Sequence, residues 1–156
     1  MVRDVVFVAD CDRSRQRYVL VATGEISRGT ACDVLVVLHG HGGDRWQFVR
    51  ENRGECRACR DVVAERRMLM VSPDYRGDSW MGPKAEADLI QILRQMRMQY
   101  RVRRVFLAGA SMGGTAALTF TALHPEMVDG VVALNAVANL GYADGHRLIA
   151  PDNVFL

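Results

Sequence analysis

The segment that most constrains the fold lies at residues 109–114, where the sequence GASMGG fits the pattern G-x-S-x-G. A short apolar run precedes it at residues 105–108, and a helix-like stretch follows at residues 115–123. In such a strand-to-helix turn the serine stands exposed at the carboxyl end of a sheet, in strained backbone geometry, and the glycines avoid clashes with the neighbouring strand or helix. The segment therefore predicts Ser111 as a nucleophile at a helix N-terminus. The alternative is a glycine-rich turn with an incidental serine.

Apolar runs alternate with helical patterns along the rest of the chain, which is typical of an α/β protein. Two short strands open the chain as an antiparallel hairpin, and the later apolar runs have the composition of strands buried on both faces. We expect a mostly parallel sheet with helices on both faces, in one partial domain over residues 1–156. The expected strands are 5–9, 18–22, 33–38, 68–71, 104–108 and 131–134; the expected helices are 45–67 with a break at 52–54, a helix starting at Pro83, and 115–123.

Composition excludes some function classes. The net charge of +2 and the scattered arginines give no basic stripe for nucleic acid. No segment approaches the length of a membrane span, and the apolar run near the N-terminus is too short and too acidic for a secretory leader. We therefore expect no nucleic-acid or membrane partner and a cytoplasmic location.

Four cysteines leave three interpretations. Only Cys56 and Cys59 form a C-x-x-C pair, while Cys11 and Cys32 stand alone. A zinc site needs a second pair or histidines at ligand spacing, and the nearest histidines lie in a loop with another expected role. Zinc binding and a redox dithiol remain as alternatives, but we expect reduced thiols and no metal.

A glycine-rich loop follows the strand at residues 33–38. Its sequence, HGHGGD at residues 39–44, allows backbone N–H groups to point into a cavity. Acyl transfer by Ser111 requires two such donors for the developing oxyanion. We expect one to be the N–H of Met112, directly after the serine, and the other to be that of His41 or Gly42.

Three motifs in this order resemble the α/β-hydrolase superfamily, and more narrowly its carboxylesterase and prolyl-oligopeptidase-like (S9-type) branches. The resemblance covers residues 5–139 and implies hydrolysis of a small ester or peptide substrate through an acyl-enzyme, without a cofactor. The motifs that carry it are HGHGG at 39–43, PDYRG at 73–77 and GASMGG at 109–114, supported by SWMGP at 79–83 and ALHP at 122–125.

The chain departs from the family pattern after the serine. The triad order in that superfamily is Ser, then Asp or Glu, then His, with the last two on loops after later strands. Only the strand at 131–134 is expected among the 45 residues that follow Ser111. The last two strands and their catalytic loops are therefore expected to be missing, as in a truncated hydrolase.

The tail offers few partners for the serine. His146 is the candidate base, and Asp144 or Asp152 is the candidate acid. Residues two apart in a turn rarely face each other, so Asp144 and His146 form a poor orienting pair. Asn139 stands where some relatives carry the acid, but it is uncharged.

Three residues upstream receive other roles. His41 is close to the serine in this fold, and we expect it to position its loop rather than to act as the base. His39 is expected to pack beneath the oxyanion loop, and Asp74 to fix a loop. The resulting hypotheses are a working serine hydrolase, a truncated core that binds ligand or forms a homodimer through an exposed sheet edge, and, remotely, a metal or redox protein.

Overall fold

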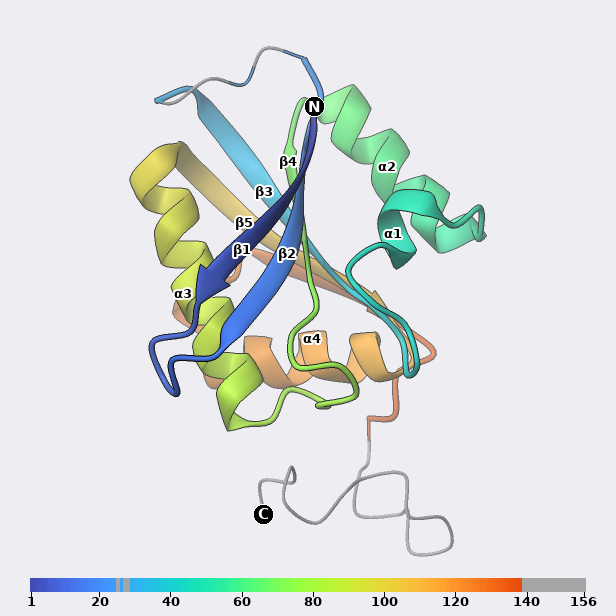
Figure 1. Cartoon of the computed structure of the whole chain (residues 1–156). Coiled ribbons are helices and arrows are strands. Elements are labelled where there is room, and N and C mark those ends of the chain that lie inside the picture. The colour runs from blue at the N-terminus through green and yellow to red at the C-terminus, as the bar shows by residue number, and fades with distance from the viewer. Residues whose placement is uncertain (25, 27–28, 139–156) are drawn as a thin grey trace, which may run out of the picture.

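The computed structural model describes residues 1–24, 26 and 29–138. Six strands form one sheet in the order β1-β2-β4-β3-β5-β6 (Figure 1). The strands are β1 Val2–Val8, β2 Arg15–Ala22, β3 Ala31–Leu38, β4 Leu69–Pro73, β5 Arg101–Ala110 and β6 Gly130–Leu134. The helices are α1 Gln47–Arg50, α2 Gly54–Arg66, α3 Pro83–Gln99 and α4 Met112–Leu123, with a 3₁₀ turn at Pro125–Met127.

The pairing of the strands confirms the predicted fold class. β1 and β2 form the antiparallel hairpin, and β2 runs antiparallel to β4. β3, β4, β5 and β6 are parallel, and every residue of β3 from Cys32 to Leu38 is buried. The helical segment expected over 45–67, with its break at 52–54, is confirmed as the single turn α1 followed by α2, which begins at Gly54.

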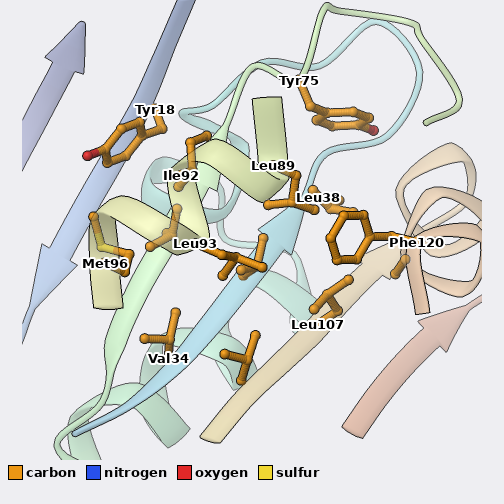
Figure 2. Packing of buried hydrophobic residues seen from close by; sticks show 14 of the residues in the cluster. Tyr18, Val34, Leu38, Tyr75, Leu89, Ile92, Leu93, Met96, Leu107 and Phe120 are labelled. Atoms are coloured by element: carbon orange, nitrogen blue, oxygen red, sulfur yellow. The ribbon is translucent and has the colours of Figure 1, made fainter. Parts of the chain in front are cut away.

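Side-chain alternation along β3 divides the core between two faces of the sheet. Val34, Val36 and Leu38 pack with α3 and α4, and Figure 2 shows Leu89, Ile92 and Leu93 of α3 on the same side of the sheet as Val34 and Leu38. Leu35 and Val37 point the other way, toward α1 and α2. The helices therefore cover both faces, as the alternation of strands and helices predicted.

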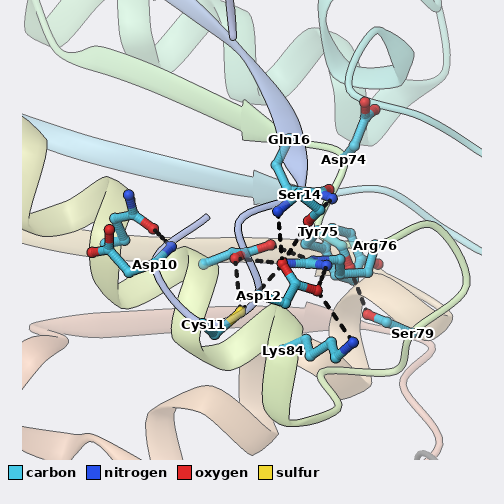
Figure 3. A network of polar contacts seen from close by, with 12 residues as sticks. Asp10, Cys11, Asp12, Ser14, Gln16, Asp74, Tyr75, Arg76, Ser79 and Lys84 are labelled. Carbon is cyan, nitrogen blue, oxygen red and sulfur yellow. Dashed lines mark hydrogen bonds and ion pairs between the residues drawn. The ribbon is translucent and has the colours of Figure 1, made fainter. Parts of the chain in front are cut away.

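A cluster of ion pairs fastens the turn between β1 and β2 to the loop after β4 (Figure 3). Arg76 donates to Asp12 at 2.8 Å and to the buried Asp88 of α3 at 2.9 Å, and the Nζ of Lys84 lies 3.2 Å from Asp12. Hydrogen bonds from Arg76 hold the pKa of Asp12 well below its ordinary value, and those from Ser14 act in the same direction. The loop after β4 is thereby anchored from outside the sheet.

β6 is an edge strand within the described part of the chain. Its Val132 and Leu134 remain 57% and 44% exposed, and they line an apolar groove with Val62 of α2 and Phe48 of α1. The edge strand and the groove leave a sheet face open next to α2. None of the described helices is long and apolar enough to cross a bilayer.

Candidate active site

Ser111 forms the turn between β5 and α4. It is exposed and has φ 55° and ψ −123°, a conformation that costs a non-glycine residue about 1–3 kcal/mol. Its main-chain N–H donates to the carbonyl of Leu134 in β6 at 2.9 Å, which fixes the turn against the neighbouring strand. The side chain stands at the first turn of a twelve-residue helix, where the helix dipole favours negative charge.

The glycines of the motif have the close contacts expected of them. A Cβ atom on Gly113 would overlap the carbonyl oxygen of Leu38, and one on Gly109 would overlap that of Gly113. β3, β5 and α4 therefore approach at distances that only glycine permits. This close approach brings the end of β3, and the loop that follows it, next to Ser111.

His39 begins that loop and is completely buried. Its Nδ1 lies 2.8 Å from the Gly40 carbonyl and its Nε2 lies 3.2 Å from the Asp74 carbonyl. The hydroxyl of Tyr75 donates to the His39 carbonyl at 2.6 Å, and burial raises the pKa of Tyr75 so that it stays protonated. These contacts agree with the structural role expected of His39.

The glycines after His39 form a tight turn. Gly43 N–H donates to the Gly40 carbonyl at 3.0 Å, and Gly40 N–H donates to the side chain of Gln47 at 3.0 Å. Gly42, at φ +73°, donates its N–H to the carboxylate of Asp78 at 2.7 Å. Of the two N–H groups expected as oxyanion donors in this loop, that of Gly42 is therefore already engaged.

Two main-chain donors remain near Ser111 without an acceptor within the described residues. One is the N–H of Met112, which opens α4 and so has no intrahelical partner. The other is the N–H of His41, whose side chain is 64% exposed. One donor from the elbow and one from the loop after the central strand is the combination predicted for an oxyanion hole, and that role stays a prediction.

Asp74 fixes the other end of the loop. Its carboxylate accepts the main-chain N–H of Arg45 at 2.9 Å and the guanidinium of Arg45 at 3.0 Å. The same guanidinium pairs with Asp4 of β1, and its hydrogen bonds lower the pKa of Asp4. Asp74 therefore holds a loop in place, as expected from the sequence.

The histidines in the described part of the chain do not hydrogen-bond to Ser111. His39 faces carbonyl groups, His41 lies 3.5 Å from Asp78, and His124 binds Glu86 at 2.7 Å. The candidate base His146 and the candidate acids Asp144 and Asp152 lie outside the described residues, as does Asn139. Their roles stay predictions.

The cysteines have properties of ordinary thiols. Burial raises the pKa of Cys59 to about 11 and raises that of Cys56 as well, so both are protonated at neutral pH. The thiolate is the form that binds metals and attacks disulfides. Among the described residues, no three His, Cys, Asp or Glu side chains gather as potential metal ligands.

Sequence reasoning missed three residues that shape the oxyanion loop. Gln47 accepts the Gly40 N–H, Tyr75 binds the His39 carbonyl, and Asp78 binds the Gly42 N–H. Tyr75 lies within the PDYRG motif at 73–77, but nothing in its sequence context indicates its partner. Gln47 and Asp78 carried no motif signal at all.

Comparison with known families now adds to this geometry. A profile of the family described as serine aminopeptidase, S33, matches residues 72–151, just over half of the chain. The chain belongs to the S33 family. This places it among the α/β-hydrolases, as its motifs predicted, while the narrower resemblance to S9-type enzymes stays a prediction.

Sequence relatives of this S33 member include the 2-succinyl-6-hydroxy-2,4-cyclohexadiene-1-carboxylate synthases of Salmonella agona and Salmonella typhimurium. Each is 31% identical over 86 residues. The match takes in 54% of this chain but only 31% of each synthase.

Solved structures with the same fold include three esterase-type proteins. Fluorophosphonate-binding serine hydrolase F of Staphylococcus aureus has a TM-score of 0.76 at 15% identity and matches 88% of this chain and 57% of its own. S-formylglutathione hydrolase of Agrobacterium tumefaciens has a TM-score of 0.70 at 16% identity and matches 88% of this chain and 58% of its own. The ferulic acid esterase AmCE1/Fae1A of Anaeromyces mucronatus has a TM-score of 0.68 at 15% identity and matches 87% of this chain and 59% of its own. The chain thus spans less than three fifths of these structures.

Proposed function

We propose that this chain carries the nucleophile half of a serine hydrolase that cleaves carboxylic esters or peptide-like bonds. The observation that carries the proposal is the geometry of Ser111, an exposed serine at positive φ that caps the N-terminus of α4. A strained conformation of this kind persists only where the surrounding structure enforces it, and such positions cluster at functional sites.

The proposed reaction begins when Ser111 Oγ forms a bond to the acyl carbon and gives its proton to a base. The main-chain N–H groups of Met112 and His41 stabilise the negative charge on the acyl oxygen. The bond to the leaving group then breaks, and the alcohol or amine departs with the proton. Water attacks the acyl-enzyme in the same way and regenerates the serine.

The proposed base and acid follow β6 in the sequence. His146 is the only histidine after β6, and Asp144 or Asp152 would orient it. A base at this place in the sequence agrees with the order of the triad in α/β-hydrolases.

An ester is the favoured substrate class. The structural neighbours named as a ferulic acid esterase and an S-formylglutathione hydrolase act on esters or thioesters according to their names. The family name supports the alternative of an amide bond near a free amino group. Small p-nitrophenyl esters and aminoacyl p-nitroanilides would distinguish the two.

A second candidate is a hydrolase core that binds ligand without efficient turnover. The observation in its favour is that no histidine within the described residues hydrogen-bonds to Ser111. An oxyanion hole without a complete triad still leaves a rate enhancement of about a thousandfold over water, so slow acylation is expected even in this case.

Labelling with a fluorescent fluorophosphonate separates these candidates. The wild-type chain should label at one site, and Ser111→Ala should not label. His146→Ala should label at least about 100-fold more slowly if His146 is the base, because a general base contributes about that factor or more.

Each outcome decides one part of the proposal. Labelling of the folded wild-type chain that is slow and no faster than that of His146→Ala favours the ligand-binding core, and absence of any labelling contradicts the hydrolase proposal. Equal labelling of wild type and His146→Ala removes His146 from the base role while leaving Ser111 as the nucleophile.

A further inference from the structure

Asp78 lies in the loop between β4 and α3, and its carboxylate reaches across to the oxyanion loop. Its Oδ1 accepts the Gly42 N–H at 2.7 Å and lies 3.5 Å from Nδ1 of His41. The side chain is 41% exposed. It therefore touches the two residues from which the second oxyanion donor was expected.

Three other aspartates near this loop form ion pairs with arginine. Asp74 is neutralised by Arg45, and Asp12 and Asp88 are neutralised by Arg76. Within the described part of the chain, Asp78 has no arginine or lysine partner. Because it takes no part in these ion pairs, its removal leaves the contacts of Arg45 and Arg76 with both loops in place.

The bond to Gly42 acts on the backbone around His41. A peptide unit is planar and trans, so its C=O and N–H point in opposite directions. The Gly43 N–H holds the Gly40 carbonyl and thereby directs the His41 N–H outward on the opposite side of that unit. Asp78 holds the next peptide unit, which carries the Gly42 N–H.

Both peptide units that flank His41 are therefore fixed, one by Gly43 and the other by Asp78. The second unit has the greater need of a restraint. Gly42 adopts φ +73° and has open space where a side chain would lie, so neither packing nor a Cβ atom limits its rotation.

We infer that Asp78 is a positioning residue of the oxyanion loop. Its carboxylate holds the Gly42 peptide so that the His41 N–H is preorganised to receive the charge that develops on the acyl oxygen. This inference rests on the proposed hydrolase function for its catalytic consequence, but the restraint on the loop is a property of the folded chain by itself.

Substitution of Asp78 tests the inference through the split between kcat and KM for p-nitrophenyl acetate. Asp78→Ala should lower kcat about tenfold, less than the hundredfold or more lost with a whole oxyanion donor. KM should stay within about twofold, because the donor acts mainly in the transition state. Asp78→Asn keeps an oxygen acceptor for the Gly42 N–H and should recover most of the loss.

The control is Asp61→Ala, which removes the same charge from an exposed position on α2. It should leave kcat, KM and the melting temperature unchanged. If Asp78→Asn is as impaired as Asp78→Ala, the carboxylate acts through its charge and the positioning role is wrong. If Asp78→Ala keeps full kcat, the inference is also wrong.

Amide NMR keeps the test independent of turnover. In Asp78→Ala the Gly42 amide should lose protection from hydrogen exchange and the His41 amide resonance should shift, and both should return in Asp78→Asn. Unchanged His41 and Gly42 resonances in Asp78→Ala overturn the inference even in an inactive chain. If the variants show this pattern but the wild-type chain neither labels nor hydrolyses, the proposed function is wrong and the restraint by Asp78 still holds.

Discussion

Ser111 concentrates the unusual backbone geometry of the site in one residue. At φ 55° and ψ −123° the serine is held by the Leu134 carbonyl on one side and by the first turn of α4 on the other. The conformation is costly for any residue with a Cβ atom and nearly free for glycine. Stability and chemistry therefore make opposite demands at this position.

Replacing Ser111 by glycine or by alanine separates these demands. Both variants lose the nucleophile, but only Ser111→Gly relieves the strain. Unfolded glycine has the greater chain entropy, which offsets part of the gain. We therefore expect the free energy of unfolding of Ser111→Gly to exceed that of Ser111→Ala by about 1 kcal/mol. Urea denaturation of the two variants measures the difference, and equal midpoints would mean that the turn stores no strain.

Substitution of Gly113 is expected to destabilise the chain. Gly113→Ala places a methyl group against the backbone of β3, which cannot move without disturbing the centre of the sheet. We expect a loss of about 3 kcal/mol in the free energy of unfolding, at the upper end for overpacking. Thermal unfolding checks this, with Gly54→Ala on the surface of α2, where no atom lies within contact distance, as the matched control.

At the scale of elements, two loops and a hairpin turn are tied together beside the sheet. The loop after β3 is held by Asp74, Tyr75 and Asp78 of the loop after β4. That second loop is in turn held by Asp12 of the β1–β2 turn through Arg76. Two sets of polar contacts therefore connect the β1–β2 turn with the loop after β3.

The ion pairs of Asp12 and Asp4 predict how stability depends on pH. The pKa of each carboxyl is lower in the folded chain than in the unfolded chain, so the unfolded state binds more protons in acid. The stabilisation is complete above the unfolded value of about 3.9 and is lost as the pH falls toward the folded value. The free energy of unfolding should therefore decline below about pH 4.

Urea denaturation between pH 6 and pH 3 measures this decline. Asp12→Asn should be less stable than wild type at pH 6, and its stability should fall less steeply in acid. Parallel profiles for the two proteins would show that the Arg76 pair contributes nothing to the acid sensitivity.

Sequence predicted the elements better than the contacts between them. The strand at 33–38 was recognisable because burial on both faces leaves an unbroken apolar run, and the elbow because its glycines are required by backbone contact. The partners of Gly42 and of His39 were not, because a hydrogen bond between two loops depends on where distant strands place them. The break expected at 52–54 was also found, between α1 and α2.

At the scale of the whole molecule, the described sheet has one closed and one open side. α3 and α4 cover one face from β3 to β6, whereas α1 and α2 leave the β6 end of the other face bare. An exposed edge strand with apolar side chains is a site for pairing with another chain. We propose that the 156-residue chain forms a homodimer through β6.

Light scattering after size exclusion tests the homodimer. We expect a mass that rises toward twice the monomer with concentration, and a monomer for Val132→Lys, which places a charge on the open edge. Val6→Lys makes the same change on β1, at the opposite edge of the sheet, and should leave the dimer intact. If Val6→Lys dissociates the dimer and Val132→Lys does not, the interface lies at β1. A monomeric wild type would exclude a dimer through either strand.

The first turn of α4 also decides where the backbone goes after the sheet. Thr115 Oγ1 accepts the Val137 N–H at 2.9 Å and donates to the Val137 carbonyl at 3.1 Å, one helical turn from Ser111. Leu134 binds the N–H of Ser111 itself. The backbone therefore leaves β6 next to Ser111, and the hydroxyl of Thr115 holds it at Val137. The same short segment, from Ser111 to Thr115, therefore holds both the end of β6 and the backbone that follows it up to Val137.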